Sequence, residues 1–334
     1  MGSSRSTLRI RGLLREAGIH VLITLASLAL AEMLLRVADF RGLRQDASEA
    51  ELGWVPVPGS VTTVTTARTI HAQHNSLGFR DIEFKPDGRP VMLFLGDSFV
   101  WGVDAEASER FTDILRGQLP EFQTVNAGVS GYGTDQEYLW LQRIWPSVHP
   151  SVVVLFFCTD NDRLDNTSNL RYDRYRKPYF VIGADGALVL KGQPVPGSLQ
   201  VMIKEYWLVR HLWRGRVAAL AYAEISAPGI SLPDPTERLV SAVRDFVSAH
   251  DAKLVVALQT TDGRMAAHLK SEGIPFVALD GAASFPVEYG HFTPEGHAFA
   301  ARRLLGLLDV TVRVGQNPPT LANDDAGRTV GVKR

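Results

Sequence analysis

Apolar and amphipathic segments alternate along the chain from residue 90 to residue 308. Two segments, Val91–Leu95 and Val152–Phe157, contain only apolar residues, which is typical of strands covered on both faces. Further strands are expected at 123–125, 253–258 and 275–279. Apolar residues at helical spacing predict helices at 108–119, 134–145, 237–250, 264–272 and 294–308. This alternation predicts an α/β fold, in which helices cover both faces of a parallel sheet.

A separate apolar run lies near the N-terminus, from Gly18 to Leu35, and contains one charged residue, Glu32. Its roughly 18 residues, at about 1.5 Å each, give about 27 Å, enough to cross the apolar core of a bilayer. Four arginines precede the run, and positive charge on that side favours a cytoplasmic N-terminus. We therefore expect a cytoplasmic basic segment at 1–17 and a transmembrane signal anchor at 18–36, with the rest of the chain outside the cytoplasm.

Two other interpretations of this run remain open. Ala29-Leu30-Ala31 has the small-x-small pattern of a signal-peptidase site, so the run can be a cleaved signal peptide. It can also be a helix buried in the protein core. The anchor is favoured because the apolar residues continue past that site through Met33-Leu34-Leu35.

The segments on either side of the alternating region have a different character. Residues 37–89 are expected to form an extracytoplasmic lead-in, in which Val61–Ile70 is rich in Thr and Val and predicts an extended strand. The α/β domain is expected to occupy 90–310. The tail at 311–334 contains two adjacent prolines and several polar residues, and we expect it to be disordered.

One stretch at about 163–235 interrupts the alternation and is interpreted as an insertion in the α/β domain. Within it, two short apolar runs around Ala184-Asp185-Gly186 predict a β-hairpin over 178–191. The following apolar and basic segment, 199–222, predicts a helix that contains Trp207 and Trp213.

Composition and charge narrow the classes of function. With 35 Lys and Arg against 36 Asp and Glu, the net charge is −1, which gives no global electrostatic reason to bind nucleic acid. The single cysteine, Cys158, excludes an intrachain disulfide and a cysteine-based zinc site. No His/Glu cluster has metal-ligand spacing, and no glycine-rich phosphate loop is present. The sequence therefore predicts neither a metal nor a cofactor.

Polar residues that can perform chemistry occur in four loops. Gly96-Asp97-Ser98 follows the first apolar strand, Asn126–Gly131 follows the next strand, and Asp160-Asn161-Asp162 follows the strand at 152–157. His291 lies just before the last helix, for which Thr293 is the expected N-cap. Because open α/β sheets bind ligands at the carboxyl ends of their strands, we expect these loops to meet in one crevice.

The residue types in these loops suit nucleophilic catalysis by serine. A serine hydroxyl attacks an ester once a neighbouring base removes its proton, and His291 can be that base for Ser98. A carboxylate behind the imidazole would fix its tautomer. Attack creates an oxyanion, for which the backbone N–H groups of Ser98 and Gly131 and the amide of Asn161 are candidate donors.

The four loops resemble the blocks for which the SGNH/GDSL hydrolase superfamily is named. The serine block is Gly96–Gly102, the glycine block Asn126–Gly131, the asparagine block Asn161-Asp162 and the histidine block His291–His297. The resemblance covers about residues 90–308. It is greatest to a bacterial, membrane-anchored branch that also has an Asn-x-x-Gly-Phe-Arg segment, here Asn75–Arg80.

This resemblance implies a flavodoxin-like, three-layer α/β/α domain with a central parallel sheet, preceded by the N-terminal transmembrane helix. It also implies Ser98 as the nucleophile, His291 as the base, and Gly131 and Asn161 as oxyanion donors. The family usually has an aspartate two or three residues before the histidine, where this chain has Tyr289 and Glu288. We expect Glu288 to be the triad acid.

Two roles stay open at this stage. Asp280 is the alternative to Glu288 as the acid behind His291. Arg80, at the end of the lead-in motif, either binds substrate or pairs with a carboxylate.

The function implied is that of a serine esterase or acyltransferase that works through an acyl-serine intermediate. We expect it at the inner membrane, held by a single pass at 18–36, with its catalytic domain in the periplasm. Its expected substrates are acylated glycans or lipids of the cell surface. One alternative is a polysaccharide O-acetyltransferase that works with polysaccharide-modification machinery. Another, kept open by the altered acid position, is a non-catalytic glycan-binding or assembly factor on a hydrolase scaffold.

Overall fold

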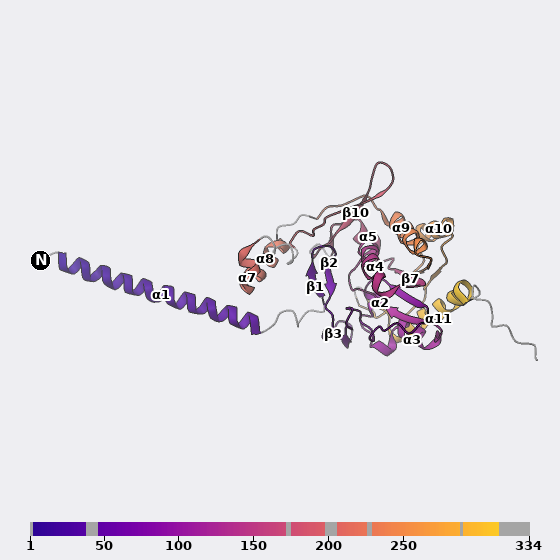
Figure 1. Cartoon of the computed structure of the whole chain (residues 1–334), viewed down its shortest axis with the longest axis horizontal. Coiled ribbons are helices and arrows are strands. Elements are labelled where there is room, and N and C mark those ends of the chain that lie inside the picture. The colour runs from indigo at the N-terminus through magenta and orange to yellow at the C-terminus, as the bar shows by residue number, and fades with distance from the viewer. Residues whose placement is uncertain are drawn as a thin grey trace, which may run out of the picture.

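The computed structural model describes residues 3–37, 46–171, 175–197, 206–225, 229–287 and 290–313. A long N-terminal helix, α1 (Ser3–Val37), projects away from a folded α/β domain (Figure 1). Small hairpins lie between α1 and the central sheet, and a group of short elements follows the third strand of that sheet.

The central sheet has five strands, all parallel to their neighbours: β5 (Val91–Leu95), β6 (Gln123–Asn126), β7 (Val152–Phe157), β12 (Lys253–Leu258) and β13 (Phe276–Ala278). Their spatial order is β13-β12-β7-β5-β6. Counted along the chain, this is the order 2-1-3-4-5 of flavodoxin-like sheets. The predicted fold class is confirmed.

Helices cover both faces of this sheet, as the apolar strands require. One face packs against α4 (Thr134–Val148), α9 (Thr236–Ala249) and α10 (Gly263–Ser271). The other face packs against α2 (Ser98–Trp101), α3 (Phe111–Gln118) and α11 (Pro294–Leu308). Alternate residues of β5 supply the two cores, because Leu93 points to the first face, whereas Met92 and Phe94 point to the second.

Several predicted boundaries match those of the structure, including the strands 91–95, 152–157 and 253–258. Thr293 caps α11, and its side chain accepts a hydrogen bond from the Gly296 N–H. The prediction of one strand over Val61–Ile70 was wrong. The chain turns at Thr66, whose N–H donates to the carbonyl of Arg68, so β3 (Val61–Thr65) and β4 (Thr69–Gln73) form a hairpin.

Most of the remaining elements lie in the lead-in and the insertion. The lead-in also contains a hairpin of β1 (Asp46–Glu49) and β2 (Gly53–Pro56). The other elements are α5 (Asp162–Asn166), β8 (Leu170–Arg171), β9 (Tyr175–Arg176), β10 (Tyr179–Ile182), β11 (Leu188–Lys191), α7 (Trp207–His211), α8 (Trp213–Ile225), a 3-10 turn at Ala107–Glu109 and a π-helical turn at Asp309–Arg313. The expected hairpin is β10–β11. Of the expected helix at 199–222, residues 199–205 lie outside the described residues, and the rest divides at Leu212.

Helix α1 contains the expected apolar run. Its segment Gly12–Val37 is long and apolar enough to cross a membrane, and only 6% of its most apolar window is buried, which excludes a core helix. Near the end of α1, Glu32 accepts hydrogen bonds from the backbone N–H groups of Trp213 (2.8 Å) and Arg214 (3.2 Å). These bonds join α1 to the start of α8, and α7 and α8 accordingly lie beside the end of α1 in Figure 1.

Candidate active site

Ser98 lies at the first turn of α2, directly after β5, and its side chain is buried. The sharp turn from strand to helix depends on its neighbours. Asp97 caps α2 by accepting a hydrogen bond from the Phe99 N–H at 2.9 Å. At Gly96 a Cβ would lie 2.4 Å from Val100 Cγ2, so the close packing of α2 on the strand requires glycine. The two loops after β5 and β7 flank the point where the strand order reverses, the usual ligand site of such sheets.

His291 contacts this serine from the loop before α11. Its Nε2 lies 2.9 Å from Ser98 Oγ. The imidazole also packs against the ring of Phe99, with ring centroids 5.0 Å apart, which limits its orientation. The fold thus brings together two of the residues predicted from the sequence. They lie near the beginning and near the end of the α/β domain in the sequence.

The charge state of His291 suits a proton acceptor. Burial lowers the pKa of His291, and the carboxylates of Asp97 and Asp104 oppose this effect. The imidazole is therefore neutral near pH 7, and its Nε2 accepts the Ser98 hydroxyl proton in the tautomer that carries hydrogen on Nδ1.

For the acid behind His291, the sequence predicts Glu288, with Asp280 as the alternative. Glu288 lies outside the described residues. Asp280 has other partners, because its carboxylate accepts hydrogen bonds from the N–H (2.9 Å) and the hydroxyl (2.7 Å) of Thr261. The carboxylate near the histidine belongs to Asp104, whose Oδ2 lies 3.6 Å from His291 Nδ1. Asp104 is not among the residues predicted from the sequence, because it follows the nucleophile in the chain, whereas the family pattern directs attention to the histidine block.

The glycine block packs on α2, and the asparagine block contacts Asp97, the neighbour of the nucleophile. Gly128 packs so closely on α2 that a Cβ at this position would lie 2.4 Å from the backbone nitrogen of Trp101. Gly131 adopts φ +83°, a conformation that favours glycine. Asn161 follows β7, and its Nδ2 lies 3.4 Å from Asp97 Oδ2, which in turn lies 3.5 Å from Ser98 Oγ. Within the described part of the chain, no acceptor is recorded for the backbone N–H of Ser98 or of Gly131.

A group of buried carboxylates lies behind the nucleophile, which sequence reasoning did not identify. Its members are Asp97, Asp135, Glu137, Asp162 and Asp165. Lys177 pairs with Asp135, and Arg171 pairs with Asp165 at 2.5 Å. Burial, together with the surrounding carboxylates, raises the pKa of Glu137 well above its usual value. Burial therefore favours the protonated form of this carboxyl group in the folded protein.

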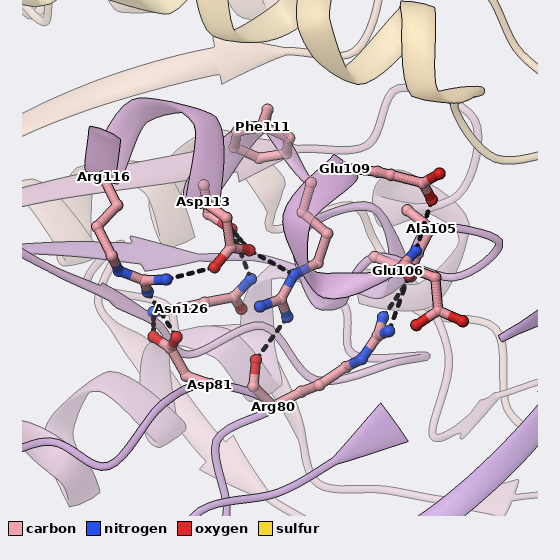
Figure 2. Close-up of polar contacts among 12 residues, drawn as sticks. Arg80, Asp81, Ala105, Glu106, Glu109, Phe111, Asp113, Arg116 and Asn126 are labelled. Carbon is pink, nitrogen blue, oxygen red and sulfur yellow. Dashed lines mark hydrogen bonds and ion pairs between the residues drawn. The ribbon is translucent and has the colours of Figure 1, made fainter. Parts of the chain in front are cut away.

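Arg80 takes neither of the roles considered for it. The side chain is buried and donates hydrogen bonds to the backbone carbonyls of Trp101 (3.1 Å), Gly102 (2.5 Å) and Ala105 (2.8 Å). Figure 2 shows Arg80 directed toward the chain at Ala105, beside a network in which Arg116 joins Asp113 and Asp81. The lead-in motif thus holds the segment that follows the nucleophile helix.

No group of His, Cys, Asp and Glu within the described ranges has the arrangement needed to hold a metal ion. The arrangement present is a serine hydroxyl hydrogen-bonded to a neutral imidazole, with the candidate oxyanion donors in the loops after β5, β6 and β7. Chemically, this set can activate a hydroxyl for attack on a carbonyl carbon and bind the oxyanion that forms.

One protein family and several solved structures are similar to this chain. Residues 94–299 match the model of the GDSL-like lipase/acylhydrolase family. Similar solved structures include a GDSL-like lipase from Bacteroides thetaiotaomicron (11% identity, 69% of this chain and 92% of that chain covered, TM-score 0.36). A second is a lipolytic G-D-S-L family member from Veillonella parvula (14% identity, 66% of this chain and 97% of that chain covered, TM-score 0.35). A third is the esterase EstA from a Pseudoalteromonas species (7% identity, 66% of this chain and 97% of that chain covered, TM-score 0.37).

No curated protein matches the chain. The family model, however, spans more than half of the 334 residues and includes the Ser98 and His291 loops. The chain therefore belongs to the GDSL-like lipase/acylhydrolase family of ester-cleaving hydrolases.

Proposed function

We propose that this protein is a serine esterase that cleaves its substrate through an acyl-Ser98 intermediate. The observation that carries the proposal is the 2.9 Å contact between His291 Nε2 and Ser98 Oγ. A neutral imidazole at this distance accepts the hydroxyl proton as Oγ attacks the carbonyl carbon of the ester.

The proposed reaction has two halves. In the first, Oγ forms a bond to the carbonyl carbon, His291 takes the proton, and the tetrahedral intermediate expels the alkoxide, which leaves as an alcohol after receiving that proton. In the second, water attacks the acyl-serine, His291 removes its proton, and Ser98 leaves and regains its hydrogen. In each half, the N–H groups of Ser98 and Gly131 and the amide of Asn161 stabilise the oxyanion.

The proposed substrates are acylated glycans or lipids outside the cytoplasm. This part of the proposal is supported by the segment Gly12–Val37, which is long and apolar enough to span a membrane, and by the arginines before its apolar run. N-terminal sequencing of the protein from the membrane fraction tests the uncleaved anchor. A chain that begins at Glu32 would instead establish a cleaved signal peptide.

The nucleophile is tested by the change Ser98→Ala in the full-length protein, assayed with p-nitrophenyl acetate. We expect the rate to fall by several orders of magnitude and to leave about 10³-fold over water, because the rest of the site remains. Labelling by a fluorophosphonate should disappear in the same variant. Ser248→Ala, an exposed serine on α9, is the control and should keep both properties. A folded Ser98→Ala protein that retains more than half of the wild-type rate would refute the assignment.

A further inference from the structure

We propose that Asp104 positions His291, taking the place that the triad acid has in serine hydrolases. The inference rests on the proposed function, because it assigns a role toward the proposed base. It differs from the sequence prediction, which placed the acid at Glu288. The argument depends on where the two oxygens of the Asp104 carboxylate point and on how the chain holds this residue.

The two oxygens of Asp104 have different surroundings. Oδ1 accepts hydrogen bonds from the Thr66 hydroxyl and from the Arg68 backbone N–H, the latter at 3.0 Å. Oδ2 is fully buried and has no hydrogen-bond partner among the described residues. The atom that Oδ2 faces is His291 Nδ1, at 3.6 Å. A buried anionic oxygen without a partner is costly, and a proton on Nδ1 is the donor that would satisfy it.

The separation of 3.6 Å is longer than a hydrogen bond. Such bonds are often long in a ligand-free enzyme and tighten when substrate binds. The side chain behind Oδ2 is well fixed, because the two bonds to Oδ1 hold the carboxylate from the β3–β4 turn.

The backbone around Asp104 is held as firmly as its side chain. Asp104 adopts φ +63°, a left-handed conformation that only a few residue types tolerate. Arg80 binds the carbonyls on both sides of it, those of Gly102 and Ala105. The lead-in therefore contributes to the site in two ways. Its β3–β4 turn orients the carboxylate, and its Arg80 fixes the segment that carries Asp104.

Two carboxylates and a second imidazole act on the titration of His291. Asp97, from the turn after β5, and Asp104 both raise the affinity of the imidazole for a proton. His297, on α11, is buried, and its pKa is lowered to about 3, so it is neutral at working pH. Loss of the Asp104 charge should therefore move the titration of His291 to lower pH.

The test compares Asp104→Asn with wild type in the full-length protein. Asparagine tolerates the left-handed backbone and can still accept the two hydrogen bonds at Oδ1. Its amide nitrogen would instead donate to His291 Nδ1 and leave the proton on Nε2, where the base cannot act. We expect kcat to fall about 10²- to 10⁴-fold with KM nearly unchanged, and the acidic limb of the kcat/KM profile to move to lower pH.

Two further variants separate this role from a structural one. Thr66→Val removes one hydrogen bond to the same carboxylate but keeps its charge, and should leave the acidic limb in place. Glu288→Gln removes the carboxyl group that the sequence predicts as the acid, and should lower kcat less than tenfold. The proposal is overturned if Asp104→Asn and Thr66→Val have equal effects with no shift of the acidic limb. It is also overturned if Glu288→Gln abolishes turnover while Asp104→Asn does not.

A readout without turnover distinguishes failure of this inference from failure of the proposed function. Nitrogen-15 spectra of histidine-labelled protein report which ring nitrogen of His291 is protonated, with His291→Ala providing the assignment. We expect hydrogen on Nδ1 in wild type and on Nε2 in Asp104→Asn. An unchanged tautomer would refute the positioning role, even in a protein that fluorophosphonates do not label.

Discussion

Asn161 is the residue at which binding and transition-state stabilisation can be told apart. Its amide lies beside Asp97, within the group that also holds Ser98. The oxyanion exists only after attack, so a donor to it favours the transition state over the bound substrate. We expect Asn161→Ala to lower kcat about 10²- to 10³-fold, with KM nearly unchanged. Steady-state kinetics would contradict this role if KM rose and kcat stayed constant.

Glu137 allows a test of the buried carboxylates through stability. The pKa of Glu137 is raised in the folded protein, so folding favours its protonated form. The pKa in the unfolded chain is about 4.5, and as pH rises above this value toward the folded pKa the wild-type protein loses stability. Glu137→Gln is neutral at every pH and does not share this loss. The melting temperature of the variant, relative to wild type, should therefore increase between pH 5 and pH 9.

The control for that measurement is Glu51→Gln, at an exposed position of the lead-in. Its melting temperature relative to wild type should stay constant over the same range. The limiting slope for one group is about 1.4 kcal/mol per pH unit. If the difference in melting temperature between Glu137→Gln and wild type does not vary with pH, folding does not favour the protonated form of Glu137.

Single residues differ in how far the sequence identifies them. Ser98 and His291 could be found because each lies in a recognisable block next to a predicted strand or helix. Asp104 could not, because its surroundings in the sequence, Val103 and Ala105, carry no pattern, and its role depends on contact with a loop far along the chain. Arg80 was found as a motif residue, but its partners are carbonyl groups, which no sequence pattern reveals.

At the level of elements, the sheet was the most predictable part. Strands such as Val91–Leu95 are buried on both faces, so their sequences are apolar throughout and their ends coincide with polar loops. The lead-in was less predictable. Its β3–β4 hairpin has exposed residues on both strands, so a turn between them leaves little trace in the apolar pattern.

The contact between the lead-in and the nucleophile segment gives a prediction at this scale. Arg80→Lys supplies one ammonium group where the guanidinium donates to four backbone carbonyls, so buried acceptors lose their donors. We expect the free energy of unfolding to fall by about 2–4 kcal/mol. Thermal unfolding in detergent measures this loss. A substrate-binding arginine would instead raise KM and leave the melting temperature unchanged, which would contradict the structural role.

Across the whole molecule, α1 and α8 are joined through Glu32. Arg36 adds a bond to the preceding helix, from its Nη2 to the carbonyl of His211 in α7 at 2.8 Å. The sequence could not predict this contact. A glutamate at the end of an apolar run has an equally good explanation as an interfacial residue, and its partners are backbone groups of the insertion.

Limited proteolysis tests this contact in the full-length protein. Glu32→Ala removes the acceptor for the N–H groups of Trp213 and Arg214, so the α7–α8 segment should open more often. We expect trypsin to cut after Arg210, Arg214 or Arg216 about tenfold faster, with the sites identified by mass spectrometry. Glu51→Ala is the control and should cleave like wild type. Equal rates in Glu32→Ala and wild type would show that the contact does not restrain this segment.

The Glu32 contact has a kinetic meaning when α1 crosses a bilayer, as proposed. It is a second attachment between the catalytic domain and its anchor, so the domain does not rotate freely about the chain that connects them. An ester in the same membrane then has a high effective concentration at the active site, whereas the effective concentration of an ester in solution is not raised by the attachment. For such an enzyme, turnover is expected to follow the surface density of its substrate more closely than the bulk concentration.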